Sequence, residues 1–294
     1  MRASSWFLFA VPVLVWSTTF FVITFQLNSP TTPAYAVAIR FMVAALLLFI
    51  WVKGRKLPIK LSGRHHGIAA TSGVCAYGIS YVLTYLSELV IPSGLVAIAF
   101  TLMVFFTPLF ARIAHGTKIT RATWIGGSIG LFGVSLMFLP DLLDAGATTI
   151  AGWGVGAMLV AALVSSIASV LSIQLNRDAV PVVIYTAWAM FYGASATFIY
   201  ALLSGQTLVF DPRLSFWLAL AYLSWAGTLL AFLCYLILLK REGPTKAMYI
   251  SVLSPVGAVI VSVFIEGLRP AALTWFGIGI SLVGAWYTLT HKQS

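Results

Sequence analysis

The sequence predicts an all-α integral membrane protein with ten transmembrane helices. Two observations carry this prediction. Hydrophobic residues make up 61% and charged residues only 8% of the 294 positions, and apolar stretches of about 20 residues follow one another along the whole chain. The mean hydropathy of +1.01 is too high for a soluble fold, which could not cover so much apolar surface. A third observation, an internal repeat, predicts that the helices form a five-plus-five inverted repeat.

Windows of about 20 residues place the ten spans along the chain. Their limits are 6–25, 33–52, 67–87, 93–114, 123–139, 151–174, 181–203, 214–240, 247–265 and 272–289. The first span follows Arg2, as in a signal peptide, but it is long and no small-x-small cleavage site follows it, so we expect a retained helix. The longest charged connection, 53–66, is too short and too basic to fold alone.

The basic residues fall on alternate connections. Fourteen of the 17 Lys and Arg residues lie on the side of the termini, whereas the other side has Arg213 and Arg269, and Arg40 lies within a span. By the positive-inside rule both termini are cytoplasmic, which requires an even number of spans. The net charge of +10 therefore reflects membrane topology, and no nucleic-acid partner is expected. Acidic residues gather on the side opposite the basic one: Glu88, Asp141, Asp144, Asp211 and Glu266.

Few residues of the chain suit metal, redox or proton chemistry. Cys75 and Cys234 lie inside apolar segments, and their spacing suggests neither a disulfide nor a metal cluster, so we expect small core residues. No cofactor and no metal site are predicted. Neither Asp nor Glu lies at mid-membrane, and all four His residues lie at the predicted cytoplasmic surface. A proton-coupled pump usually keeps an acid or a His in its pathway, so the sequence favours facilitated transport or uniport. Coupling to protons is the alternative, and it would have to use the acids at the outer ends of the helices, Glu88 and Glu266.

An internal repeat relates the two halves of the chain. One helix earlier than the final span of each half, Thr107-Pro108 matches Ser254-Pro255. We therefore assign 1–144 to a first repeat and 145–294 to a second, within one membrane domain. Because five is odd, the second copy enters the membrane from the opposite side, and such an inverted repeat is the physical basis of alternating access. The final spans share one pattern, with Trp124, Gly126 and Gly133 matching Trp275, Gly277 and Gly284.

The chain contains the motifs Pro12-x-x-x-Trp16-Ser17, Arg40-Phe41 and Leu253-Ser254-Pro255. These motifs and several others resemble those of the drug/metabolite transporter superfamily, EamA type. His115 occupies the position in the first half that corresponds to Glu266 in the second half, so the first half lacks the acidic residue of the family motif. The resemblance implies that helices one, three, four, six, eight and nine enclose a central cavity, with five and ten outside. Within the superfamily the chain most resembles the bacterial exporters of aromatic and other amino acids. The motifs are Pro12-x-x-x-Trp16-Ser17, Arg40-Phe41, Gly227-Thr228, Lys240-Arg241-Glu242-Gly243, Leu253-Ser254-Pro255, Phe264-Ile265-Glu266-Gly267 and Gly277 through Gly284.

Aromatic and hydroxyl side chains near mid-depth are the candidates for the cavity wall. Tyr77, Tyr81 and Tyr85 recur every four residues and share one helix face. An aromatic stripe is also typical of a core or an interfacial belt, and helix hydroxyls also bond back to their own helix or join neighbours. The predicted cavity residues are Trp16, Tyr77, Tyr81, Phe100, Ser165, Trp225, Tyr249 and Ser251.

Two prolines and one arginine are further candidates. Pro108 and Pro255 each remove a helix hydrogen bond, which frees the carbonyls of Val104 and Ser251 for a substrate ammonium and allows a hinge; a static kink is the alternative. Arg40 is the one basic residue well inside a span. It is either a contact for a substrate carboxylate or a structural charge paired with helix carbonyls or with Glu88.

The predicted function is secondary transport that exports amino acids, aromatic and other neutral ones, across the bacterial inner membrane. A membrane enzyme is disfavoured because the chain has no nucleophile with its base, no paired acids and no metal-ligand spacing, and the inverted repeat argues against a passive channel. A multidrug or other small-metabolite exporter is the alternative. A nucleotide-sugar carrier would need several cationic residues in the cavity. The expected partners are the amino-acid substrate and the lipid bilayer, with a monomer as the working assembly.

Overall fold

The computed structural model describes residues 4–116, 118–143, 148–242 and 244–291, and within them it consists of helices joined by turns and loops, with no strand. Its helices in chain order are α1 (Ser5–Leu27), α2 (Pro33–Gly54), α3 (Gly63–Gly73), η1 (Val74–Ser80), α4 (Tyr81–Glu88), α5 (Ser93–Ala99), η2 (Phe100–Leu102), α6 (Met103–His115), α7 (Arg121–Leu143), α8 (Thr148–Arg177), α9 (Val182–Leu203), α10 (Leu214–Ala221), η3 (Tyr222–Leu230), α11 (Ala231–Glu242), α12 (Pro244–Ile265) and α13 (Ala272–Thr290). Segments η1 and η3 are π-helical, and η2 is a single 3₁₀ turn.

The described residues form ten continuous helical runs, because η1, η2 and η3 each join two α-helices end to end. Nine of the runs in the described part of the chain are long and apolar enough to cross a membrane, and α12 is apolar over Ile250–Ile265. The prediction of an all-α membrane fold is thereby confirmed. The span limits expected from hydropathy agree with the helices to within a few residues at each end.

Local sequence sets several of the helix ends. The hydroxyl of Ser4 accepts a hydrogen bond from the backbone N–H of Phe7 at 3.2 Å and caps α1, and Ser62 caps α3 in the same way through His65. Pro33 occupies the first turn of α2, where its missing N–H costs nothing. Helix α6 ends at Gly116, which adopts the left-handed conformation with φ of 66°.

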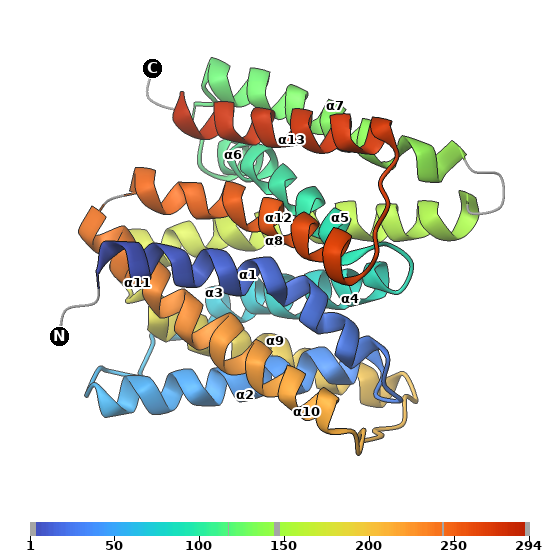
Figure 1. Cartoon of the computed structure of the whole chain (residues 1–294). Coiled ribbons are helices and arrows are strands. Elements are labelled where there is room, and N and C mark those ends of the chain that lie inside the picture. The colour runs from blue at the N-terminus through green and yellow to red at the C-terminus, as the bar shows by residue number, and fades with distance from the viewer. Residues whose placement is uncertain (1–3, 117, 144–147, 243, 292–294) are drawn as a thin grey trace.

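The helices lie side by side in one bundle, with the start of α1 and the end of α13 at the same end (Figure 1). Helices α7 and α13 pack together along one edge of the bundle, and α2 packs on α9 at the opposite edge. The remaining helices fill the space between these pairs. We call the end that holds the start of α1 the terminal end and the other the distal end.

The contacts between helices follow a pseudo-two-fold pattern. Exchanging the two halves of the chain turns the contact of α1 with α12 into that of α8 with α6, and both contacts are present. The contact of α3 with α9 likewise corresponds to that of η3 with α2, and both are again present. Each edge pair joins two equivalent helices, one from each half. The contact pattern therefore agrees with the five-plus-five repeat.

Glycines at the α7–α13 crossing show that the two halves are inverted. A Cβ added at Gly126 would lie 2.5 Å from the Gly284 carbonyl oxygen, and one added at Gly133 would lie 2.7 Å from the Gly277 carbonyl oxygen. The earlier residue of α7 therefore meets the later residue of α13, so the helices run antiparallel. Because Gly126 matches Gly277 and Gly133 matches Gly284, an in-plane two-fold axis exchanges the two contacts. Only glycine permits this close backbone approach.

Candidate functional site

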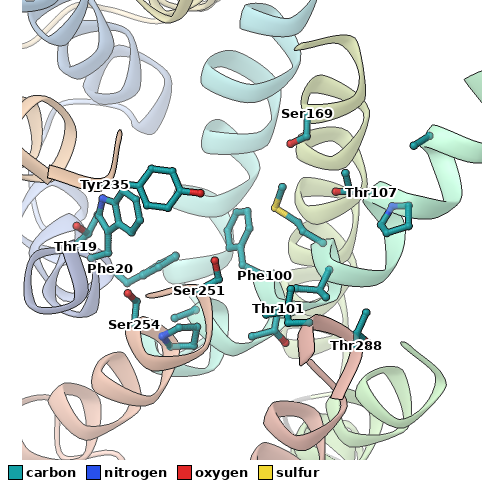
Figure 2. Close-up of a pocket in the computed structure, with 18 of the residues that line it drawn as sticks. Thr19, Phe20, Phe100, Thr101, Thr107, Ser169, Tyr235, Ser251, Ser254 and Thr288 are labelled. Atoms are coloured by element: carbon teal, nitrogen blue, oxygen red, sulfur yellow. The ribbon is translucent and has the colours of Figure 1, made fainter. Parts of the chain in front are cut away.

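A cavity of about 830 Å³ lies in the middle of the bundle (Figure 2). Its wall comes from α1, α4, the run from α5 to α6, α8, α11 and α12. These are the first, third, fourth, sixth, eighth and ninth spans, the set that the family resemblance implies. The end of α13 also contributes Thr288 and Leu289, which that resemblance does not include.

The cavity opens at the terminal end of the bundle. Lys118, in the connection between α6 and α7, lines the cavity and is exposed, so the cavity reaches the surface there. In the opposite direction the lining stops at Ile23, Tyr81 and Ala97. Beyond them a buried apolar cluster of α5, α7, α8 and α12 fills the distal end. The structure is therefore a state with access from one side.

Aromatic rings form much of the cavity wall. Phe20 and Phe100 lie with their ring centroids 5.8 Å apart, and Trp16 and Tyr235 are paired at the same distance. Figure 2 shows the rings of Phe20, Phe100 and Tyr235, carried by α1, η2 and α11, around one space. The Trp16 indole N–H donates to the Gly227 carbonyl oxygen at 3.0 Å, which fixes the ring against η3. The wall thus presents flat apolar surface to a ligand.

Hydroxyl groups lie between the rings. Thr19 donates to the Val15 carbonyl at 2.9 Å and Ser169 to the Ser165 carbonyl at 2.9 Å, so both are bonded to their own helices. The Ser254 hydroxyl is buried in the cavity wall and has no hydrogen-bond partner among the described residues. A polar group left without a partner at membrane depth is costly. The Ser254 hydroxyl is therefore an unsatisfied polar group of the wall, although it is not exposed to the cavity in this state.

Both prolines lie at the cavity, one on each facing helix. Helix α6 presents Pro108 and helix α12 presents Pro255, and each stands after a hydroxyl residue. The residues whose carbonyls the prolines release also belong to the wall. The proline and the residues beside it therefore line the cavity in both repeats. These residues are Val104, Thr107 and Pro108 on α6 and Ser251, Ser254 and Pro255 on α12.

The structure places four of the predicted cavity residues at the wall, namely Trp16, Tyr81, Phe100 and Ser251. Tyr77 instead packs on Phe41, with ring centroids 5.0 Å apart. Tyr249 is also a predicted cavity residue, but its side chain lies outside the part of the chain that the structure describes.

Two further predicted residues point elsewhere. Ser165 bonds to the Ser80 hydroxyl at 2.6 Å and joins α8 to η1. Trp225 lies on the outside of the bundle with 55% of its surface exposed. Other residues of the same helical runs line the wall instead. Ser169 lies one turn beyond Ser165 on α8, and Tyr235 lies on α11, which continues the run that holds Trp225. Sequence reasoning also missed Phe20 and Lys118 as parts of the wall.

Arg40 lies beside the cavity and is buried, with 1% of its surface exposed. Its guanidinium donates to the Tyr85 hydroxyl at 3.2 Å and lies 5.0 Å from the ring centroids of Phe41 and Tyr81. The Tyr85 hydroxyl in turn donates to the side-chain oxygen of Gln26 at 2.6 Å. Arg40 is thus separated from the cavity by the Tyr81 ring, which lines it.

Charged pairs at the two ends tie connections together. At the distal end the guanidinium of Arg213 bonds to Asp211 at 2.9 Å and also to the Asn28 carbonyl. The hydrogen bonds from Arg213 to Asp211 lower the pKa of Asp211 to about 2. At the terminal end the pKa of Asp178 is lowered, mainly by a hydrogen bond from Gln174 and to a smaller extent by one from His65. Both carboxylates are therefore ionised over the physiological range.

Ten helices in an inverted repeat, around a cavity with access from one end, define the class of secondary membrane transporters. The chain belongs to the EamA-like transporter family, whose profile matches it twice, at residues 3–139 and 152–290. Membership of this family makes the protein a membrane transporter and not an enzyme.

Relatives and a solved structure agree with this assignment. The chain is 27% identical over 271 residues to the uncharacterized inner membrane transporter YedA of Escherichia coli (strain K12), which covers 91% of this chain and 84% of the relative. It is 25% identical to the uncharacterized transporter sll0355 of Synechocystis, over 96% of this chain and 88% of the relative. A crystal structure with 17% identity covers 98% of this chain and 96% of its own with a TM-score of 0.67, which shows the fold alone.

Proposed function

We propose that the protein exports amino acids, aromatic and other neutral ones, across the inner membrane by alternating access. The location follows the name of the relative YedA, an inner membrane transporter. The distribution of basic residues supports an orientation with both termini, and with them the open end of the cavity, in the cytoplasm. In this orientation the structure is the state that receives a substrate from the cell interior.

The observation that carries the proposal is the composition of the cavity wall. Aromatic rings supply a surface for an apolar side chain. Hydroxyl groups, together with the backbone carbonyls that the prolines free, supply acceptors for an ammonium group. Among the described lining residues the charged one is Lys118, at the mouth. A volume of about 830 Å³ lies within the range of small-molecule sites.

A multidrug or other small-metabolite exporter is the second candidate, because the same rings suit a lipophilic drug. Lipophilic cations would need a carboxylate in the wall, and no acid lines the cavity in the part of the chain that the structure describes. Phosphorylated substrates would need several cations, against the single Lys118. The wall therefore favours a neutral or zwitterionic substrate.

Facilitated transport or uniport is proposed on the same ground. Since no carboxylate or imidazole lines the cavity among the described residues in this state, the cavity as it stands offers no group for a proton to bind. Counterflow in proteoliposomes should persist after the pH gradient is collapsed. Transport abolished by that collapse would instead show proton coupling.

The test is uptake of labelled Phe, Trp, Thr and Met into proteoliposomes of the purified protein, with a cationic dye measured beside them. We expect saturable flux of the amino acids, reduced by Tyr81→Ala. Flux of the dye alone would overturn amino-acid export and assign the protein to the multidrug branch of the family.

A further inference from the structure

A polar cluster lies directly behind the deep end of the cavity, toward the distal end. It consists of Gln26 on α1, Arg40 on α2, and Tyr85 and Glu88 on α4, and we call it the distal cluster. Gln26 and Arg40 are each 1% exposed and Glu88 is 9% exposed. None of the four belongs to the cavity wall as it stands.

The cluster continues the cavity wall by one helical turn. Ile23 lines the cavity, and Gln26 follows it three positions later on the same face of α1. Tyr81 lines the cavity, and Tyr85 follows four positions later on α4, with Glu88 three positions beyond. The faces that bound the cavity therefore lead without interruption to the distal cluster.

Hydrogen-bonding groups in this cluster are left unused. The Nε of Arg40, the side-chain nitrogen of Gln26 and both carboxylate oxygens of Glu88 are buried without a partner among the described residues. Two donors and one carboxylate thus stand free in one small region. Leaving such groups unpaired in a folded state is unfavourable, so a ligand or another state that supplies partners for them gains free energy.

The cluster holds groups that can carry opposite charges. Arg40 carries one positive charge, and Glu88 lies near enough to interact with it electrostatically, although the two make no ion pair in this state. Glu266, at the end of α12, is a second carboxylate in range of Glu88. A zwitterion adds no net charge to such a site and meets opposite charges at both ends, whereas a cation or an anion meets only one.

We propose that the distal cluster binds the charged head group of a zwitterionic substrate in the conformation that opens the distal end. The substrate carboxylate takes donors from Arg40 Nε and Gln26, and its ammonium group meets the Glu88 carboxylate. The ring of Tyr81, which now separates Arg40 from the cavity, moves aside as the substrate passes. This inference rests on the proposed function and adds a determinant of specificity that the cavity wall lacks.

The experiment compares three probes with one ring but different charges: phenylalanine, 2-phenylethylamine, which lacks the carboxylate, and 3-phenylpropionate, which lacks the ammonium group. Each is measured as uptake into proteoliposomes by wild type, Arg40→Gln, Gln26→Leu and Glu88→Gln. The Asp178→Asn variant is the control, because it removes a carboxylate at the terminal end, outside the cluster.

Wild type should prefer phenylalanine over both analogues. Arg40→Gln and Gln26→Leu should lower the ratio of phenylalanine to phenylethylamine flux at least tenfold, and Glu88→Gln should lower the ratio to phenylpropionate to a similar extent. The control should change neither ratio. A structural role alone would reduce all three fluxes together and leave the ratios constant.

Ratios equal to those of wild type in Gln26→Leu and Glu88→Gln, with phenylalanine still transported, would overturn this inference and leave amino-acid export standing. These two variants keep the test decisive if Arg40→Gln does not fold. Absence of phenylalanine transport by wild type would overturn the proposed function itself.

Discussion

Two contacts between the halves of the molecule differ in how far they extend. Helices α7 and α13 touch along their crossing through glycines at both ends of the contact, from Gly126 to Gly133. The run from α5 to α6 contacts α12 closely only at the distal end, where a Cβ added at Gly94 would lie 2.8 Å from the Cβ of Ser262. At the terminal end the cavity lies between Pro108 on α6 and Pro255 on α12. The first contact has the form of a fixed scaffold, and the second has the form of a gate.

The largest effect is expected from filling the closed part of the gate. In the Gly94→Leu variant the new side chain collides with Ser262 and with the backbone of Val259, so the distal end cannot close and the cycle stops. Transport should fall by about a factor of ten or more, since a blocked packing site costs at least 1–3 kcal/mol. A matched control is Gly156→Leu, because nothing lies within 4 Å of a Cβ at Gly156.

Labelling can show that the gate is held open. A Ser93→Cys substitution in a Cys75→Ala, Cys234→Ala background places a thiol beside Gly94, at a position that is 2% exposed. With Gly94→Leu this thiol should react with an impermeant maleimide from the distal side. Unchanged labelling together with normal transport would show that the α5–α12 contact does not move.

A smaller effect is expected at the cavity itself. Tyr81→Ala removes a ring that lines the cavity and covers Arg40, whereas Tyr77→Ala removes one that packs on Phe41 away from it. We expect flux of labelled Phe to fall about tenfold for the first, equivalent to about 1.4 kcal/mol, and by less for the second. Equal losses would mean that both rings act through packing alone.

The scaffold contact should affect stability and spare the transport cycle. Gly126→Val forces a side chain onto the Gly284 carbonyl, which should cost about 1–3 kcal/mol or more of stability by overpacking. Thermal unfolding of the purified protein in detergent measures this loss, and Gly279→Val on α13, where a Cβ meets nothing within 4 Å, is the control. Flux per folded molecule should stay near that of wild type; if it falls as far as with Gly94→Leu, α7 and α13 also move.

The smallest effect is expected at the distal connections, where Asp211 holds Arg213. Its pKa of about 2 lies below the unfolded value of about 3.9. The charged carboxylate therefore stabilises the fold above about pH 4, and this contribution is lost as the pH falls toward 2. The melting temperature of Asp211→Asn should be slightly lower than that of wild type by a constant amount from pH 5 to 8, and the difference should shrink below pH 4.

Hydropathy and charge were sufficient to predict the helices, because both depend on long stretches of sequence. Helix phase is harder to predict, since the residues of a span in lipid are apolar on every side. Ser165 and Ser169 have the same chemistry one turn apart, and only the second lines the cavity. Trp225 lies in η3, where the wider π-helical turn changes the phase that 3.6 residues per turn would give.

The distal cluster was only partly visible in the sequence for a related reason. Arg40 stands out as a charge within a span, and Glu88 is one of its predicted partners. Gln26 and Tyr85 carry no such signal, because one amide near a helix end and one tyrosine in a stripe are common. Their connection appears only when α1, α2 and α4 are packed together and the hydrogen bonds from Arg40 through Tyr85 to Gln26 are formed.

The two π-helical segments carry information about how the chain arose. Val74–Ser80 and Tyr222–Leu230 occupy the middle of the third span of each half. The offset in sequence between these two segments equals, to within one helical turn, the offset between Pro108 and Pro255. A π-helical turn arises when one residue is inserted into an α-helix. Two independent insertions at equivalent places are less economical than one insertion in an ancestral five-helix protein, later copied with the rest of the gene. The irregularity is then older than the duplication, and the ancestor already had it when two copies assembled in opposite orientations.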